Sequence, residues 1–215
     1  MNNDKRQDLR ANRLDMWESV FWQCTFPVNL NGVETVIDFG SGRNLSKAIL
    51  QHYDIKCTTV DVSPVYEPDI VSPIVKGIDI PKADFVSAFQ CLEHNQFEKF
   101  VELISTLKTY SKKYVCISLP YDGLFISFKL AIRLPKLNWR KSFFLRRCGY
   151  GGRDIDVKNL SLDGNPYRHH YWEVGNPSYK IKDLSTIIEN DCQLKIRKIV
   201  HSSTYPGHIF FLMEI

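Results

Sequence analysis

A carboxylate stands next to a glycine turn early in the sequence. Asp38 is followed by Gly40-Ser41-Gly42, and only small residues can make so tight a turn. A dinucleotide-binding turn has the spacing G-x-G-x-x-G and offers the free N-terminus of a helix to a pyrophosphate, whereas Leu45 stands here where the third glycine belongs. The carboxylate would also repel phosphate and attract an ammonium group. These residues therefore favour a ligand with an ammonium group and no phosphate, and S-adenosylmethionine is such a ligand.

The residues around this turn predict the elements that position it. Residues 33–39 form a short apolar run with the length and β-branched content of a buried strand. After the turn, apolar residues recur at helical spacing, at Leu45, Ala48, Ile49 and Leu50. Strand, glycine turn and helix are the opening unit of an open α/β sheet, whose ligand lies beyond the carboxyl ends of the strands.

The same stretch carries a family resemblance. Residues 36–42, Val-Ile-Asp-Phe-Gly-Ser-Gly, resemble the first motif of the class I S-adenosylmethionine-dependent methyltransferases. The acid and two glycines occupy the family's places, and Asn44 stands where the third family glycine would fall. The resemblance implies that the cofactor is contacted by Asp38, Gly40, Ser41 and Gly42.

Two further segments agree with this resemblance. Residues 57–62 indicate a second strand, and Asp61, about twenty residues after the glycine turn, is placed to accept hydrogen bonds from both ribose hydroxyls, with Val62 beside it. Residues 75–81 are similar to the family's third-strand segment. The resemblance implies that Asp79 accepts the adenine amino group and that Ile80 packs on the ring.

A fourth predicted strand, residues 83–89, precedes Gln90-Cys91-Leu92-Glu93-His94. This stretch resembles the family's loop after strand four, which often ends in Glu-His and lies beside the transferable methyl, so Gln90 is also expected at the cofactor. For a hydroxyl acceptor, histidine is the natural general base because it titrates near neutrality. We predict His94 as the base, while Glu93 either orients His94 or the acceptor or caps the following helix.

Residues 167–175, Tyr-Arg-His-His-Tyr-Trp-Glu-Val-Gly, are a second source of catalytic side chains. Two adjacent imidazoles point in different directions on a regular backbone, so at most one faces a given site. His169, or else His170, could supply the base from a lid. Alternatively, either histidine fixes its loop by a hydrogen bond to Glu173 or to a backbone carbonyl. The segment looks like a His-His-Trp-Glu stretch in some bacterial methyltransferase-domain proteins, including ones associated with surface-sugar pathways.

A metal site is the competing use of these side chains. Some members of the broad family bind magnesium beside a catechol, but hard cations prefer oxygen ligands, and such a site needs several acids near strands four and five. After the predicted fifth strand the chain offers only Asp122 for this purpose. We therefore expect no metal site.

The remaining periodicity completes the predicted fold. Residues 96–110 and 181–188 indicate helices, residues 114–119 a fifth strand, and residues 195–201 and 208–214 a final hairpin. Leu14, Trp17 and Phe21 recur at helical spacing and predict an amphipathic N-terminal helix. The prediction is an α/β fold: a Rossmann-like open sheet with helices on both faces, mostly parallel with a C-terminal antiparallel hairpin strand, plus a lid insertion after strand 5.

The sequence predicts a single methyltransferase domain over all 215 residues. Its expected parts are an N-terminal helical segment (1–30), a cofactor-binding half (33–120), a substrate-lid insertion (121–179), and a closing helix and hairpin (180–215). The composition, 44% hydrophobic and 24% charged, is that of an ordinary globular protein. Six scattered cysteines without a C-x-x-C pair favour reduced thiols, and no secretory signal or membrane span is apparent, so we expect a cytoplasmic protein.

The predicted lid carries an excess of positive charge. Eight of the 28 Lys and Arg residues lie between Lys129 and Arg153, where there is no Asp or Glu. This stretch could contact an acidic substrate, attach to an anionic membrane surface through an amphipathic helix that Pro135 would break, bind nucleic acid, or simply be solvated. Its many aliphatic and aromatic residues favour a small or lipid-linked acceptor, with peripheral contact of residues 124–147 at the inner face of the membrane, over nucleic acid.

These expectations combine into one function. The cofactor is S-adenosylmethionine, with S-adenosylhomocysteine as product, and the reaction is O-methylation of a small or membrane-linked acceptor such as a sugar derivative. The alternatives are an RNA methyltransferase, and a degenerate methyltransferase-like domain that acts as a binding module. An amino methyltransferase of the Asn-Pro-Pro-Tyr type is not indicated, because Phe89-Gln90-Cys91-Leu92 is not that motif.

Overall fold

One seven-stranded sheet organises the protein, in the order β3-β2-β1-β4-β5-β9-β8. The computed structural model describes residues 14–134, 137–147, 170–201 and 207–215. Neighbouring strands from β3 to β5 run parallel, whereas β9 pairs antiparallel with both β5 and β8. The strands are β1 (Thr35–Phe39), β2 (Lys56–Asp61), β3 (Ile70–Val71), β4 (Ala83–Phe89), β5 (Ser111–Pro120), β8 (Lys195–His201) and β9 (His208–Glu214). The predicted Rossmann-like sheet with an antiparallel C-terminal strand is confirmed.

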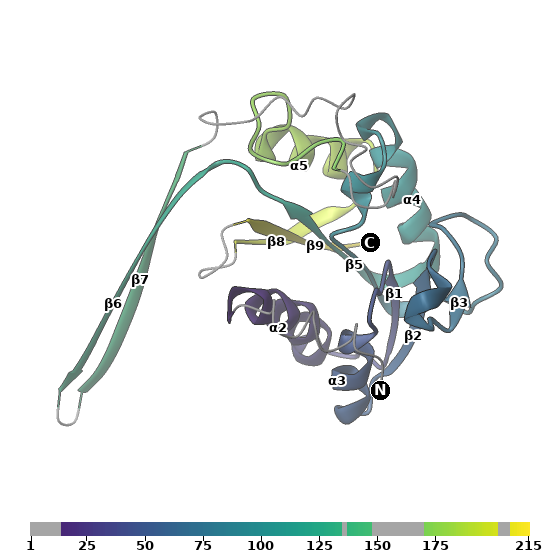
Figure 1. Ribbon diagram of the computed structural model, residues 1–215, viewed down its shortest axis with the longest axis horizontal. Helices are drawn as coiled ribbons and strands as arrows, with labels where there is room; N and C mark the ends of the chain where they lie inside the picture. Colours follow the sequence, from purple (N-terminus) through teal and green to yellow (C-terminus); the bar gives the residue numbers. More distant parts are fainter. Residues whose placement is uncertain (1–13, 135–136, 148–169, 202–206) are drawn as a thin grey trace.

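Helices cover both faces of this sheet (Figure 1). One side carries α2 (Leu14–Asn29) and α3 (Leu45–His52), and the other carries α4 (Phe100–Tyr110) and α5 (Ile181–Asn190). Short 3-10 turns η1 (Pro64–Tyr66), η2 (Leu92–His94) and η3 (Phe97–Lys99) lie in the loops.

The core is accordingly divided into two apolar layers, one on each face of the sheet. Successive residues of a strand point to opposite faces. Phe210 of β9 therefore packs on Phe26 of α2, in the apolar layer that also contains Leu50 of α3, while its neighbour Phe211 belongs to the layer that contains Ile104 of α4. Both phenylalanines are fully buried. This two-sided burial explains why the central strands read as continuous apolar runs rather than as alternating ones.

The N-terminal helix forms as predicted, but its buried face is different. Trp17 and Phe21 are 43% and 56% exposed, whereas Cys24 and Phe26 are buried. The helix packs through Trp22 and Phe26, whose rings lie 5.5 Å apart, and Phe26 continues this contact to Phe210. Its contacts are set by the aromatic residues of the last strand, which the local helical spacing does not reveal.

The predicted third strand is displaced. Residues 75–81, which resemble a third-strand segment, form a loop, and the strand beside β2 is the two-residue β3. Pro73 and Pro81 lack the N–H that a ladder needs, and Gly77 adopts a φ of 86°. The hydroxyl of Tyr110 instead holds the loop, donating to the carbonyl of Val75 (2.7 Å) and accepting from the N–H of Ile78 (2.9 Å).

The basic insertion begins with a β-hairpin and not with a helix. β6 (Leu124–Leu134) pairs antiparallel with β7 (Leu137–Arg147) in unbroken register, and the two strands project away from the seven-stranded sheet (Figure 1). Every second residue from Leu124 to Leu134 is apolar, and the residues between them include Ser127, Lys129 and Arg133, which fits the period of a strand. The amphipathic helix, one of the alternatives for this stretch, is therefore not formed by the described residues 124–134 and 137–147.

Asp84 joins three strands at the end of the sheet that lies opposite the glycine turn. Its carboxylate accepts hydrogen bonds from the backbone N–H groups of Glu34 (3.2 Å) and Thr35 (3.1 Å) and from the Thr35 hydroxyl (2.8 Å). Lys113 of β5 lies 3.6 Å away. Burial raises the pKa of Asp84, but these hydrogen bonds and the charges of Lys113 and Lys112 outweigh that effect, so the pKa is lowered.

Replacing this carboxylate by Asp84→Asn should destabilise the fold at neutral pH. Because the folded-state pKa is depressed, the stabilisation is present above the unfolded value of about 4 and disappears as the pH falls through the lower folded value. We expect a loss of about 1–3 kcal/mol in the free energy of unfolding at pH 7, from lost charge-assisted hydrogen bonds, and a smaller difference from wild type below pH of about 4. Urea unfolding over this pH range measures both, with exposed Asp191→Asn as the control. A difference that does not change with pH would contradict the role of the charge.

Candidate active site

The carboxyl ends of three strands meet where the strand order reverses. β1 lies between β2 and β4, with Phe39 in register with Val60 on one side and Ala88 on the other. The residues that follow these strands therefore lie along one edge of the sheet. This is the switch point at which open α/β sheets bind ligands.

The glycine turn adopts a conformation that requires its glycines. Gly40 has a φ of 69°, and its N–H donates to the carbonyl of Val60 (2.7 Å). A Cβ at Gly40 would lie 2.8 Å from the Cβ of Cys91 in the loop after β4, so no larger residue fits. Gly42 has a φ of 52°, and a Cβ there would meet nothing within 4 Å. The turn is thus in close contact with the loop after β4 at Gly40 and has open space beside it at Gly42.

Asp38 is buried beneath this turn. It is 3% exposed and accepts hydrogen bonds from the hydroxyls of Ser46 in α3 (2.6 Å) and Ser87 in β4 (2.7 Å). Burial raises its pKa, against the lowering effect of these two hydroxyls. Asp38 therefore stabilises the turn by linking β1 to α3 and β4. The local sequence around Asp38 does not reveal this role, because the two serines lie elsewhere in the chain. Its direct contact with an ammonium group stays a prediction.

Asp61 is joined directly to the turn. Its Oδ2 accepts from the N–H of Gly42 (2.9 Å), and its Oδ1 accepts from the N–H of Ser63 (2.8 Å). Each carboxylate oxygen has two acceptor sites, so both oxygens retain one for a ligand hydroxyl. Val62 is half-buried beside it. The structure brings Asp61 and Gly42 together, as the ribose role requires, and the role itself stays a prediction.

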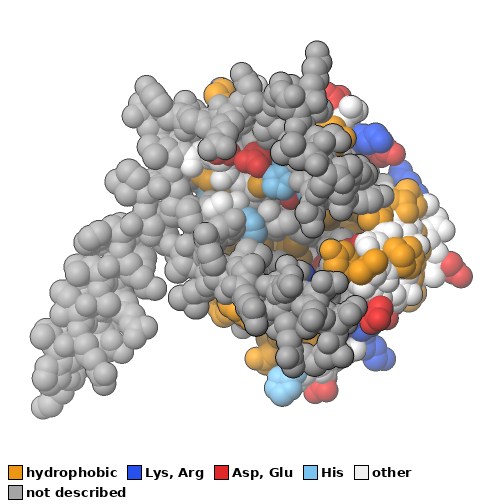
Figure 2. Space-filling view, in the orientation of Figure 1, with side chains coloured by type: hydrophobic (Ala, Val, Ile, Leu, Met, Phe, Trp, Pro, Cys, Tyr) orange, Lys and Arg blue, Asp and Glu red, His pale blue; other side chains and the backbone are white. Residues whose placement is uncertain are grey.

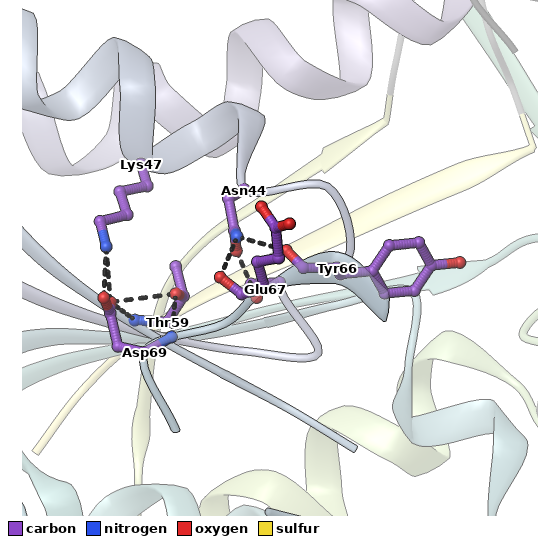
Figure 3. Close-up of polar contacts among 7 residues, drawn as sticks. Asn44, Lys47, Thr59, Tyr66, Glu67 and Asp69 are labelled. Carbon is purple, nitrogen blue, oxygen red and sulfur yellow. Dashed lines mark hydrogen bonds and ion pairs between the residues drawn. The ribbon is translucent and has the colours of Figure 1, made fainter. Parts of the chain in front are cut away.

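Asn44 replaces the third family glycine and performs two functions. It adopts a φ of 57°, a left-handed conformation that asparagine tolerates. Its side-chain N–H₂ donates to the carbonyls of Tyr66 (2.8 Å) and Glu67 (3.1 Å), and the Ser41 hydroxyl donates to its oxygen (2.9 Å) (Figure 3). Asn44 thereby ties the glycine turn to the segment after β2, a contact that local sequence does not reveal.

The remaining predicted cofactor residues lie around this edge. Gln90, at a φ of 50°, donates from its backbone and side chain to Ser118 of β5 (3.0 and 3.2 Å). Ile80 is half-buried against the core, whereas Asp79 is exposed on the loop after β3. The contacts of Gln90, Asp79 and Ile80 with the cofactor stay predictions.

A separate cavity of about 480 Å³ lies away from this edge. It is bordered by Lys47, whose ammonium group lies 2.5 Å from the carboxylate of Asp69, while Asp69 also accepts from the N–H and hydroxyl of Thr59 (Figure 3). Its other residues come from the end of α3 and the start of β2. Because ligands of this architecture bind at carboxyl ends of strands, we do not assign the cofactor to this cavity.

The loop after β4 holds an unusual carboxylate. Glu93 is fully buried, and neither of its carboxylate oxygens has a hydrogen-bond partner in the described part of the chain. Burial raises its pKa to about 7, opposed by the nearby His170. The ring of His94 lies 5.2 Å from the ring of His170. On the face of the molecule drawn in Figure 2, a histidine side chain lies beside acidic side chains. A third side chain therefore lies beside the predicted pair of Glu93 and His94.

That third group is His170, and Trp172 fixes its position. Trp172 is 1% exposed, and its indole N–H donates to the carbonyl of Asn95 (2.9 Å). The neighbouring N–H of Tyr171 donates to the carbonyl of Glu93 (2.9 Å), and Val174 pairs with the end of β5 through the carbonyl of Pro120 (3.0 Å). A segment distant in sequence is thus fixed against the loop after β4.

The hydrogen bond of His170 sets its orientation. Its Nδ1 lies 2.7 Å from Oε1 of Glu173, and this hydrogen bond raises the pKa of His170, with burial opposing it. The Nε2 atom faces Glu93 at 3.9 Å. The predicted catalytic residue His169 lies outside the described residues. The sequence signal for this pair is the three-residue spacing of His170 and Glu173. From the sequence alone, the pair is interpreted only as a contact that fixes the loop.

Comparisons with known proteins agree on the fold. No protein-family model and no curated protein matches the sequence. The structure is similar to 1,6-didemethyltoxoflavin-N1-methyltransferase of Burkholderia thailandensis, solved with 1,6-didemethyltoxoflavin and S-adenosylhomocysteine, at a TM-score of 0.59 and 11% identity over 98% of this chain and 82% of that one.

Two further solved structures are similar over nearly the whole chain. An S-adenosylmethionine-dependent methyltransferase of Clostridium acetobutylicum has a TM-score of 0.56 and 12% identity over 96% of this chain and 94% of its own. The magnesium protoporphyrin IX methyltransferase of Synechocystis, solved with S-adenosylmethionine, has a TM-score of 0.52 and 14% identity over 100% of this chain and 85% of its own. The chain has the fold of the S-adenosylmethionine-dependent methyltransferases.

Proposed function

We propose that the protein is an S-adenosylmethionine-dependent methyltransferase that methylates an oxygen atom of a small or membrane-linked acceptor, such as a sugar derivative. The observation that carries the proposal is the direct hydrogen bond from the Gly42 N–H to Asp61 at the switch point of the sheet. It joins a glycine turn to a carboxylate with free acceptor sites, in a fold whose solved examples contain S-adenosylmethionine or its product.

The residues along the edge have distinct roles in binding. Asp61 would accept hydrogen bonds from the ribose hydroxyls, and the turn from Gly40 to Gly42 would pack against the amino-acid part of the cofactor. Asp79 and Ile80 would contact the adenine. Asp38 would contact the ammonium group of the cofactor, and because it is buried within the turn, its charge would favour a cationic ligand over a phosphate.

The chemistry depends mainly on orientation. When bound, S-adenosylmethionine supplies a methyl group on a sulfonium, which is a very good leaving group. The chain must align the acceptor with this methyl, and Gln90 and the loop of Glu93 and His94 lie at the carboxyl end of β4, where that alignment would occur. A histidine of this loop would receive the proton of an acceptor hydroxyl.

The hairpin β6–β7 supports the membrane-linked form of the acceptor. Alternate residues of a strand share a face, so the register places apolar residues of both strands together on one face of the hairpin. These are Leu124, Ile126, Phe128, Leu130, Ile132 and Leu134 with Leu137, Trp139, Phe143 and Leu145. Four basic residues occupy positions of the other face, while Lys141 and Arg147 share the face of the apolar residues. The four are Lys129, Arg133, Arg140 and Arg146. An anionic bilayer surface complements both apolar and basic residues. In the described part of the chain, no helix has the length and apolarity to cross a bilayer.

Cofactor binding is tested by titration calorimetry of the purified protein with S-adenosylmethionine, S-adenosylhomocysteine and NAD. We expect the first two to bind and NAD not to bind. Asp61→Asn keeps an oxygen for the Gly42 N–H but loses the charge, so affinity for both should fall about 30- to 150-fold, the equivalent of about 2–3 kcal/mol. Exposed Asp54→Asn is the matched control.

Two outcomes would contradict these assignments. If Asp61→Asn binds as wild type does, Asp61 has no part in ribose binding. If the wild-type protein binds neither methyl donor nor product, the methyltransferase proposal fails and the degenerate binding module becomes the better description.

Membrane contact is tested by co-sedimentation with vesicles. Phosphatidylglycerol vesicles should bring down the wild-type protein at low salt, and phosphatidylcholine vesicles should not. Since each basic residue near an anionic surface contributes about 1 kcal/mol, Lys129→Glu with Arg140→Glu should weaken binding by about 30-fold or more. The control exchanges two exposed lysines away from the hairpin, Lys76→Glu with Lys182→Glu. Equal losses in both variants would show a general charge effect and remove the hairpin from the proposal.

A further inference from the structure

Three metal-ligating side chains converge beside the end of β4. Glu93, His94 and His170 each offer one ligand atom, and these atoms lie within 4.8 Å of one another. The first two belong to η2, and His170 belongs to the segment that Trp172 fixes against it. A carboxylate and two imidazoles are a donor set for divalent transition metals that leaves coordination positions open.

The buried carboxylate has no hydrogen-bond donor in the described residues, and His170 is the ionisable partner that faces it. Glu93 is 0% exposed, and Nε2 of His170 lies 3.9 Å from its Oε1. A buried carboxylate is stable only when it is paired, hydrogen-bonded or bound to a metal. A metal ion between Glu93 and His170 would therefore satisfy this carboxylate.

His170 does not supply that partner as a direct hydrogen bond. Its Nε2 lies 3.9 Å from Oε1 of Glu93, whereas a charge-assisted hydrogen bond between such groups closes to about 2.7–2.9 Å. Two ligands held about 2.1 Å from one tetrahedral ion lie about 3.4 Å apart. The observed separation is thus too long for a direct bond, and a small movement of either side chain would fit an ion between them.

The orientation of His170 also suits a metal ligand. Nδ1 of His170 lies 2.7 Å from Oε1 of Glu173, and when Nδ1 of a neutral ring donates this hydrogen bond, the lone pair of Nε2 is left on the side of Glu93, free for a metal. Metal-bound histidines commonly donate their other N–H to a carboxylate in this way, which orients the ring and raises its basicity.

We propose that Glu93, His94 and His170 bind one divalent transition-metal ion of the Zn²⁺ class, and that Glu173 is a positioning residue for His170. From the sequence alone we expect no metal site, because that expectation concerns Mg²⁺, which needs several carboxylate ligands. Two imidazole ligands instead select Zn²⁺ and related ions over Mg²⁺.

The site also defines the acceptor, and this step rests on the proposed methyltransferase function. The open positions of the ion would bind an acceptor hydroxyl, whose pKa a divalent metal lowers towards neutrality. A His94 that is bound to the ion no longer serves as the base, so in this form of the reaction the O–H bond breaks and its proton passes to solvent. The O–C bond forms, and the C–S bond breaks with its electron pair returning to sulfur. The substrate class is therefore an alcohol able to coordinate a metal, such as a sugar hydroxyl.

Metal binding is measured on the full chain, without an affinity tag and after treatment with a chelator. We expect one equivalent of Zn²⁺ to bind with a micromolar or lower dissociation constant, and Mg²⁺ to bind at least 100-fold more weakly. Co²⁺ should give visible d–d absorption. Zn²⁺ should raise the melting temperature of the wild-type protein.

Variants separate this site from other metal-binding groups. Glu93→Gln and His170→Ala should each abolish the one-equivalent site, and Glu173→Gln should weaken it about 10- to 100-fold by releasing the ring of His170. Exposed His52→Ala is the matched control and should bind as wild type does. Glu93→Gln removes the charge of a buried carboxylate and keeps the size of the side chain, so the variant should fold without metal and show no thermal shift with Zn²⁺.

The proposal is overturned if wild-type protein binds no Zn²⁺, if Glu93→Gln binds it unchanged, or if Co²⁺ gives thiolate charge-transfer absorption that points to cysteines. Titration with S-adenosylhomocysteine, with and without Zn²⁺, distinguishes a failure of the metal site from a failure of the proposed methyltransferase function. Binding of S-adenosylhomocysteine without metal binding would remove only the metal site. Metal binding without S-adenosylhomocysteine binding would remove the methyltransferase and leave the metal site.

Discussion

The buried carboxylate of Asp38 is the constraint on which the cofactor edge depends. It accepts hydrogen bonds from Ser46 at the start of α3 and from Ser87 in β4, so one side chain joins the central strand to the helix above it and to the strand beside it. Because Asp38 is 3% exposed, loss of either hydroxyl would leave a buried acceptor unsatisfied. The glycine turn is held between these two contacts, which places Gly40 against Cys91 and Gly42 against Asp61.

Trp172 has the equivalent role for the second half of the site. Its ring packs edge-to-face on Phe97 and Phe100, and its N–H is satisfied by Asn95. A large aromatic side chain buried to this extent is costly to move. The backbone beside it is therefore fixed, and His170 is held where its Nε2 faces Glu93. The apolar packing of one residue thus determines the geometry of a polar cluster.

The two halves meet at the loop after β4. Cys91 packs on the glycine turn, while Glu93, two residues later, lies in the cluster of histidines. A short loop therefore links the cofactor edge to the groups proposed to bind the acceptor. Methyl transfer requires this proximity, because the acceptor and the methyl must be aligned before reaction. Asn44 strengthens the arrangement from the opposite side by tying the turn to the segment after β2.

The sequence by itself determined the elements and their chemical character. Periodicity and glycine spacing located β1, β2, β4, β5 and most helices, because these signals are local and buried strands must be apolar. The spacing after the glycine turn also selected Asp61, and the resemblance to the methyltransferase family selected the pair Glu93 and His94 as candidates. Local reasoning failed at β6, for which a helix was the only regular structure considered. It also failed at the third strand, which is formed by residues 70–71 because prolines follow it.

Only the tertiary structure decided which distant residues meet. The contacts of Asp38 with Ser87, of Asn44 with Tyr66 and of Trp172 with Asn95 join segments from different elements, and no spacing in the chain encodes them. The absence of a donor for Glu93 in the described residues is likewise a property of the fold. The sequence therefore defined a methyltransferase-like edge, whereas packing brought His170 to Glu93, and this contact is the basis for proposing a metal-binding cluster in place of a lone base.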